Sequence, residues 1–222
     1  MKKLKSTLPN MVLSLGIVSI VAAALLAGMY TVTKEPIAQA EQRSRLDAIR
    51  RVAPDFDNDP VADAVEVTTP SGTTCTVYPA FLKGKFNGAA VSTYSMEGFG
   101  GEVTIMAGFN ADGTVKDYQV LSHSETPGLG SKMQLWFRDP KDARSILAKS
   151  PAEVSFYVVK DTEQHGEIDG ITAATISSRA FLGAVREGFE AYRMVADKQE
   201  GSGVKQAKGD ASSGASKQNS KH

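Results

Sequence analysis

The sequence predicts an α+β fold: a mixed or antiparallel sheet with flanking helices, preceded by one N-terminal membrane-spanning helix. Three observations lead to this expectation. They are a long uncharged N-terminal run, a strand-like stretch from 61 to about 124, and helical patterns on either side of that stretch. Residues 61–196 are enough for one domain, and the 41% apolar composition of the chain is enough for a core.

The N-terminal segment has the length and polarity of a membrane anchor. Residues 1–10 contain three lysines, whereas residues 11–31 contain no charged side chain. About 20 apolar residues at 1.5 Å each cross a bilayer core of roughly 30 Å. The leading lysines place the N-terminus in the cytoplasm and the rest of the chain outside, in contact with membrane lipid at the span. The alternative is a signal peptide cleaved near Ala38-Gln39-Ala40, but the run exceeds the usual signal core of about 7–15 residues.

The elements after the anchor follow from hydrophobic spacing. Leu46, Ile49 and Val52 recur at helical spacing, which predicts a membrane-proximal helix and linker over 40–60, with the helix ending before Pro54. Short runs rich in Val, Thr, Tyr and Phe predict strands at 73–82, 89–96, 101–109 and 114–122, and Asn110–Gly113 predicts a hairpin turn between the last two.

The C-terminal half is predicted to be mostly helical. Helices are expected at 131–139 and 140–150, a further strand at 152–160, and a long helix whose apolar stripe includes Phe181, Val185 and Phe189. Residues 197–222 lack apolar periodicity and are rich in Gly, Ser and Lys, which predicts a disordered polar tail.

The composition excludes several classes of function. The 25 basic and 25 acidic residues cancel, which gives no indication of nucleic-acid binding. A single cysteine and three histidines argue against a thiolate-bound zinc or iron–sulfur centre, so we expect no metal site. Redox chemistry in this chain would need an organic cofactor.

Two stretches could carry chemistry. The first, HSETPGLGSKM at 123–133, leads from a strand into a helix, and its glycines would let the backbone approach a ligand. The second, DGITAATISS at 169–178, places four hydroxyl side chains at the start of the long helix, where backbone N–H groups attract anions. An ordinary strand-to-helix turn and simple helix capping remain the alternatives at this level.

Together these features resemble RnfG, the FMN-binding subunit of the Rnf electron-transport complex, which is related to the FMN-carrying subunit of the sodium-translocating NADH:quinone reductase. The resemblance rests on the N-terminal span, on ETPGLG at 125–130 and on the Asp169–Ser177 stretch, and covers roughly residues 1–195. It implies that 61–196 form an extracytoplasmic FMN-binding domain at the cell inner membrane. The usual motif reads Ser-Gly-Ala-Thr, whereas this chain has Thr172-Ala173-Ala174-Thr175. Alanine in place of glycine is unfavourable only where φ must be positive.

The resemblance also implies a set of site residues. Thr175 would hold FMN covalently through the flavin phosphate, after transfer from FAD by a flavin transferase, and no side chain would be catalytic. The neighbouring hydroxyls would bind phosphate oxygens, and ETPGLG would lie against the flavin ring or its ribityl chain. The expected cofactor-binding residues are Thr175, Thr172, Ala174, Ser177, Ser178, Glu125, Thr126, Gly128, Leu129 and Gly130.

The role implied for the chain is electron transfer within an ion-translocating ferredoxin:NAD oxidoreductase, together with other membrane subunits. A single subunit of this kind is not a complete enzyme. One alternative is the related subunit of the quinone reductase, and another is a membrane-anchored binding module without redox chemistry.

Overall fold

The computed structural model describes residues 8–213, and the side chains among them except those of 38, 41 and 200–213. The elements in chain order are α1 (Leu8–Val52), β1 (Val65–Thr68), β2 (Thr74–Leu82), β3 (Lys85–Gly98), β4 (Gly101–Asn110), β5 (Val115–His123), η1 (Gly130–Lys132), α2 (Met133–Trp136), η2 (Thr162–Gln164) and α3 (Thr175–Ser213). Residues 1–7 of the predicted basic N-terminus and 214–222 of the predicted tail lie outside the described residues. The tail stays a prediction, although α3 itself continues to Ser213.

The chain divides into two units, 1–45 and 46–222. In the first unit, α1 is long and apolar enough to span a bilayer, and its most apolar 18-residue window has a mean hydropathy of 2.4. This property fits the predicted single membrane anchor. Instead of a separate membrane-proximal helix, α1 is one continuous helix that includes Pro36 and ends at Val52, shortly before Pro54 as expected.

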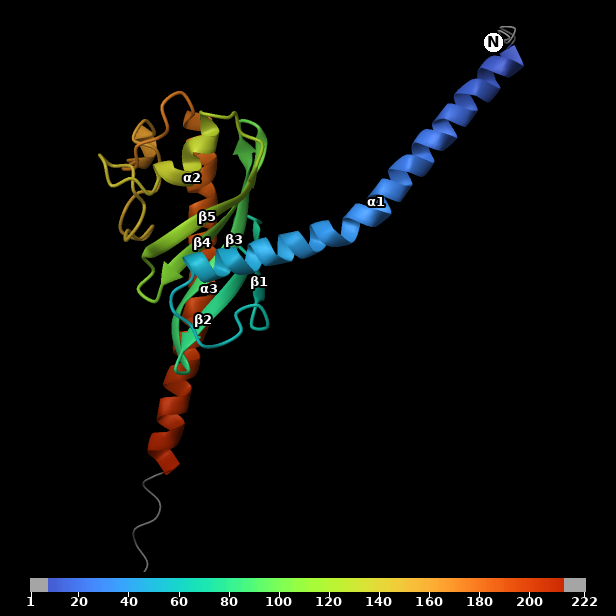
Figure 1. The fold of residues 1–222 in the computed structure, drawn as a ribbon. Coiled ribbons are helices and arrows are strands. Elements are labelled where there is room, and N and C mark those ends of the chain that lie inside the picture. The colour runs from blue at the N-terminus through green and yellow to red at the C-terminus, as the bar shows by residue number, and fades with distance from the viewer. Residues whose placement is uncertain (1–7, 214–222) are drawn as a thin grey trace, which may run out of the picture. The chain divides into compact units, whose positions relative to one another are not determined.

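The second unit is built on five strands in the order β1-β2-β3-β4-β5, each antiparallel to its neighbours (Figure 1). The four predicted strands correspond to β2–β5, and the Asn110–Gly113 turn forms the predicted hairpin, closed by a 2.9 Å hydrogen bond from Gly113 N–H to Asn110 C=O. The strand β1 was not predicted. It is short, with only four residues that pair with β2.

Both faces of the sheet are partly covered, because alternate residues along a strand point to opposite sides. Val77, Val91 and Ile105 belong to the main core, which includes the buried stripe of α3. Their neighbours Tyr78, Ala90 and Met106 form a second cluster with the last turns of α1, from Ala48 to Ala53. The contact is close: a Cβ atom added to Gly108 would lie 1.9 Å from the carbonyl oxygen of Val52.

Two predicted elements are wrong. Residues 140–150 form no helix, because their backbone bonds to other segments: Ile146 N–H donates to Phe137 C=O, and Ala148 N–H to Val115 C=O. Residues 152–160 form no strand beyond a single bridge between Val158 and Ile168. The apolar side chains of that segment, such as Phe156, are buried in the core without a neighbouring strand to pair with.

Candidate functional site

A cavity of about 370 Å³ lies where three segments of the second unit meet. They are the β3–β4 turn, the loop after β5 and the start of α3. The volume falls within the range of small-molecule sites, roughly 300–1,000 Å³. The lining residues are Phe99, Glu125, Thr126, Leu129, Gly130, Ala173, Ala174, Thr175, Ile176 and Ser177.

The structure thus brings the two sequence stretches together, although they are about 50 residues apart in the chain. Of the ten predicted site residues, the cavity is lined by seven, and only Thr172, Gly128 and Ser178 lie outside its lining. Three lining residues, Phe99, Ala173 and Ile176, were not predicted as site residues. Phe99 and Ile176 are exposed apolar side chains, 70% and 48% accessible, and nothing in their spacing distinguishes them from other surface residues.

The four hydroxyls of the 172–178 stretch have different environments. Thr172 is exposed and lies outside the cavity lining. Ser178 is fully buried, and its Oγ donates to Ala174 C=O at 2.9 Å and accepts from Ile171 N–H at 2.8 Å. The Ser178 hydroxyl therefore fixes the turn that precedes α3, and the structure gives it no position from which to reach a ligand in the cavity.

Ser177 is hydrogen-bonded to Glu125, and both residues line the cavity. Its Oγ donates to Glu125 Oε2 at 2.6 Å, and both residues are almost completely buried. The other carboxylate oxygen of Glu125, Oε1, accepts from Gly100 N–H at 3.2 Å, and the Glu125 N–H donates to His123 Nδ1 at 3.1 Å. One carboxylate thus joins all three segments that form the cavity.

Glycines make room for this carboxylate. A Cβ atom added to Gly130 would lie 2.5 Å from Ser177 Oγ and 2.6 Å from Glu125 Oε2, and one added to Gly98 would lie 2.6 Å from Glu125 Oε1. The glycines at these two positions therefore allow the backbone to approach an internal side chain. For Gly130, the sequence predicts instead that the backbone approaches a ligand.

Thr175 is the first residue of α3, is half-buried and lines the cavity. Among the described residues, its Oγ1 has no hydrogen-bond partner, in contrast to Ser177 and Ser178. The N–H groups of the first helical turn have no partner within the helix, since the first helical bond here is from Ser178 N–H to Ala174 C=O. A free hydroxyl and several backbone donors therefore meet at one end of the cavity.

The residue that departs from the usual motif has an unusual backbone conformation. Ala173 has φ +62°, in the left-handed region that glycine adopts more easily. It is the third residue of a turn that is closed by a 3.0 Å hydrogen bond from Ala174 N–H to Ile171 C=O, a position where type II turns require a positive φ. This chain therefore has an alanine at a position where glycine would be unstrained.

The turn before α3 is also held from outside the cavity. Trp136 Nε1 donates to Asp169 C=O at 2.8 Å, and the guanidinium of Arg144 lies 4.1 Å from the centre of the indole ring. The Asp169 carboxylate accepts from Ala143 N–H at 3.2 Å. Trp136 and Asp169 thus support the position of the loop that leads into Thr175.

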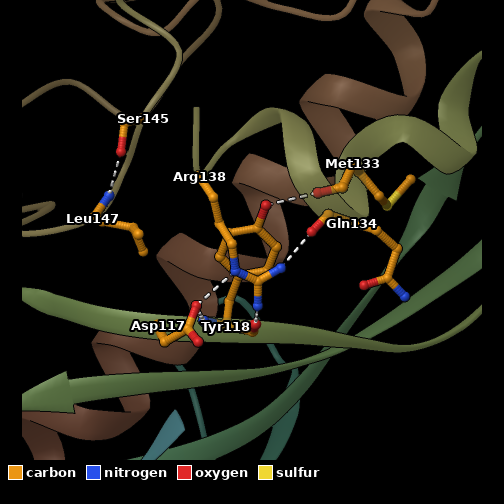
Figure 2. A network of polar contacts seen from close by, with 7 residues as sticks. All are labelled: Asp117, Tyr118, Met133, Gln134, Arg138, Ser145 and Leu147. Atoms are coloured by element: carbon orange, nitrogen blue, oxygen red, sulfur yellow. Dashed lines mark hydrogen bonds and ion pairs between the residues drawn. The ribbon is translucent and has the colours of Figure 1, made fainter. Parts of the chain in front are cut away.

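A second network attaches α2 to β5, as Figure 2 shows. Arg138 pairs with Asp117 at 2.8 Å, also donates to the carbonyls of Gln134 and Tyr118, and lies over the Tyr118 ring. The Tyr118 hydroxyl donates to Met133 C=O at 2.7 Å. Burial raises the pKa of Tyr118 above its ordinary value of 10. Since the loop 124–132 runs between β5 and α2, this network fixes both of its ends.

Comparisons with known proteins agree with this geometry. Residues 98–190 match the FMN-binding domain, and residues 1–52 match the RnfG N-terminal region. The first match includes every residue that lines the cavity.

Three relatives, each named as the G subunit of an ion-translocating oxidoreductase complex, match most of the chain. The protein from Aliivibrio fischeri strain MJ11 is 32% identical over 195 residues, which cover 85% of this chain and 91% of the relative. The protein from Stutzerimonas stutzeri is 35% identical over 80% of this chain and 78% of its own length. The protein from Cereibacter sphaeroides ATCC 17023 is 33% identical over 81% and 82%. With this coverage, the chain belongs to the RnfG family of ion-translocating oxidoreductase complexes.

Proposed function

We propose that this chain carries FMN covalently attached through its phosphate to Thr175 Oγ1, and that it transfers electrons as a subunit of a membrane-bound ion-translocating ferredoxin:NAD oxidoreductase. One observation carries the attachment site. In the described part of the chain, Thr175 is the one hydroxyl of the 172–178 stretch that both lines the cavity and lacks a hydrogen-bond partner. Ser177 and Ser178 are already engaged, and Thr172 lies outside the cavity lining.

The cavity suits the parts of a flavin mononucleotide. The backbone N–H groups at the start of α3 are oriented to donate to phosphate oxygens, and the helix dipole favours a negative charge there. Exposed apolar side chains at the opening, Phe99, Leu129 and Ile176, offer surface to an aromatic ring. When bound, FMN would supply reversible electron transfer, while the chain positions the flavin and tunes it electrostatically.

Attachment would require a flavin transferase and FAD. Thr175 Oγ1 would form a bond to the phosphorus on the flavin side of the FAD pyrophosphate, AMP would leave as the bond to its phosphate breaks, and the hydroxyl proton would be released. The half-buried position of Thr175 keeps the hydroxyl accessible to such an enzyme before the flavin occupies the cavity.

The membrane arrangement follows from α1. We place the N-terminus in the cytoplasm and the flavin domain on the outer side of the cell inner membrane, because lysines precede the apolar run. A covalent bond would keep the flavin from diffusing away outside the cytoplasm. The names of the relatives support assembly with further membrane subunits, with which this chain would exchange electrons.

The test compares Thr175→Val with Thr126→Val in the full-length chain, produced in membranes together with an active flavin transferase. Valine has the shape of threonine without the hydroxyl, and Thr126 provides a second exposed hydroxyl in the lining of the same cavity. We expect wild type and Thr126→Val to fluoresce on a denaturing gel and to gain the mass of FMN minus water. Thr175→Val should do neither. An adduct that persists in Thr175→Val, or a wild-type chain with no adduct, would refute the proposal.

A further inference from the structure

The hydroxyl of Ser177 has only one proton, and that proton is engaged. Ser177 Oγ lies 2.6 Å from Glu125 Oε2, while the residue also lines the cavity. A hydroxyl can donate one hydrogen bond and accept two, whereas an ionised carboxylate only accepts. The proton of Ser177 therefore points to Glu125, and its remaining capacity is that of an acceptor.

Glu125 has little freedom to move away from the Ser177 hydroxyl. The residue is 5% exposed, and its second oxygen accepts from Gly100 N–H at 3.2 Å. The backbones of Gly98 and Gly130 approach the two carboxylate oxygens so closely that an added Cβ would lie 2.6 Å from each. Because the carboxylate is confined in this way, it keeps accepting from the same two donors, the Ser177 hydroxyl and Gly100 N–H.

We propose that Glu125 is a positioning residue that makes Ser177 a hydrogen-bond acceptor toward the cavity. Ser177 then contacts a donor group of the flavin, either a ribityl hydroxyl or the ring N–H. The inference rests on the proposed function, since it takes FMN as the ligand. A phosphate ester presents acceptor oxygens, which the lone pairs of Ser177 would repel, so its partners are the backbone donors at the start of α3. This reverses the sequence-based expectation that Ser177 binds phosphate.

Two ligands separate these assignments, because riboflavin has the ring and the ribityl chain of FMN but no phosphate. The full-length chain, made without the flavin transferase and purified in detergent, is titrated with FMN and with riboflavin, and quenching of flavin fluorescence is followed. We expect Ser177→Ala to weaken both ligands by the same factor, about 3–10-fold, as for the loss of one hydrogen bond. The matched control Thr162→Ala, an exposed threonine outside the cavity lining, should change neither. If Ser177→Ala weakens FMN and leaves riboflavin unchanged, Ser177 contacts the phosphate and the inference is wrong.

The role of Glu125 is tested with Glu125→Gln. The amide oxygen can accept from Gly100 N–H while the amide nitrogen donates to Ser177 Oγ, so the shape is retained but the Ser177 proton is freed toward the cavity. We expect riboflavin to bind less tightly to this variant, and Glu125→Gln to have no further effect in the Ser177→Ala background. Additive effects of the two substitutions would show that Glu125 does not act through Ser177.

The chain loaded by the flavin transferase gives an independent measurement. The visible circular dichroism of the attached flavin should change in Ser177→Ala and in Glu125→Gln, but not in Thr162→Ala. Unchanged spectra in both variants would refute the assignment even if the adduct forms. A wild-type chain that neither carries an adduct by intact mass nor binds either flavin refutes the proposed function, and this inference with it.

Discussion

The alanine at position 173 makes a quantitative prediction, because its backbone is left-handed. Holding an alanine at φ +62° costs about 1–2 kcal/mol relative to its preferred conformations. Replacing it with glycine removes this strain but raises the entropy of the unfolded chain, which costs about 0.4–1 kcal/mol. Ala173→Gly should therefore stabilise the domain by about 0.5–1 kcal/mol.

The assay measures the stability of the chain without flavin, by thermal denaturation and by urea denaturation. For a domain of this size, about 1 kcal/mol corresponds to a melting-temperature shift of roughly 2–4 °C, so an increase of about 1–4 °C is expected. The matched control is Ala196→Gly in the interior of α3, which should destabilise by about 1 kcal/mol. If Ala173→Gly lowers the stability, as the control does, the left-handed strain at this turn is not what limits it.

Three further substitutions probe the packing around the site and the α2–β5 network. Gly130→Ala should destabilise the domain by about 1–3 kcal/mol and reduce flavin loading, because the added methyl would overlap Ser177 and Glu125; Gly128→Ala, which has φ +77° but no atom within 4 Å of the added carbon, should lose about 1 kcal/mol and keep its flavin. Equal flavin loading in the two variants would contradict the packing argument. Tyr118→Phe should lose about 1 kcal/mol at neutral pH with its hydrogen bond to Met133. Because burial raises the pKa of Tyr118, wild type should lose stability as pH rises above about 10, where the phenol ionises only in the unfolded chain. Urea unfolding between about pH 7 and 11 should show a shallower decline for Tyr118→Phe, and parallel curves would contradict this origin of the pH dependence.

The sheet could be predicted from the sequence because its signals are local. Alternation such as Val77-Tyr78 and Ile105-Met106 reflects two covered faces, and the Asn110–Gly113 turn defines its own hairpin. Residues 140–160 could not be predicted in this way. Besides local turn hydrogen bonds, their backbone bonds to segments outside this range, at Phe137, Val115 and Ile168, and no local pattern identifies those partners.

Most of the residues that line the cavity were named from the sequence, whereas the different environments of its hydroxyls were not predictable. The two motifs identified the residues that line the cavity, with Thr175 at the start of the helix as expected. The sequence treats Ser177 and Ser178 as equivalent neighbours. On a helix they point about 100° apart, so one meets Glu125 and the other turns inward to Ala174. Only the three-dimensional packing of Gly130 and Glu125 distinguishes them.

The close packing between Val52 and Gly108 limits where the chain can be truncated to give a soluble fragment. The last turns of α1 are part of the hydrophobic interior of the second unit, where Ile49 and Val52 cover Tyr78 and Met106. The division between anchor and domain thus falls within the residue range of α1, near residue 45. A water-soluble fragment must retain the helix from about Leu46 onward, since removing all of α1 would leave an apolar sheet face open to solvent and to aggregation.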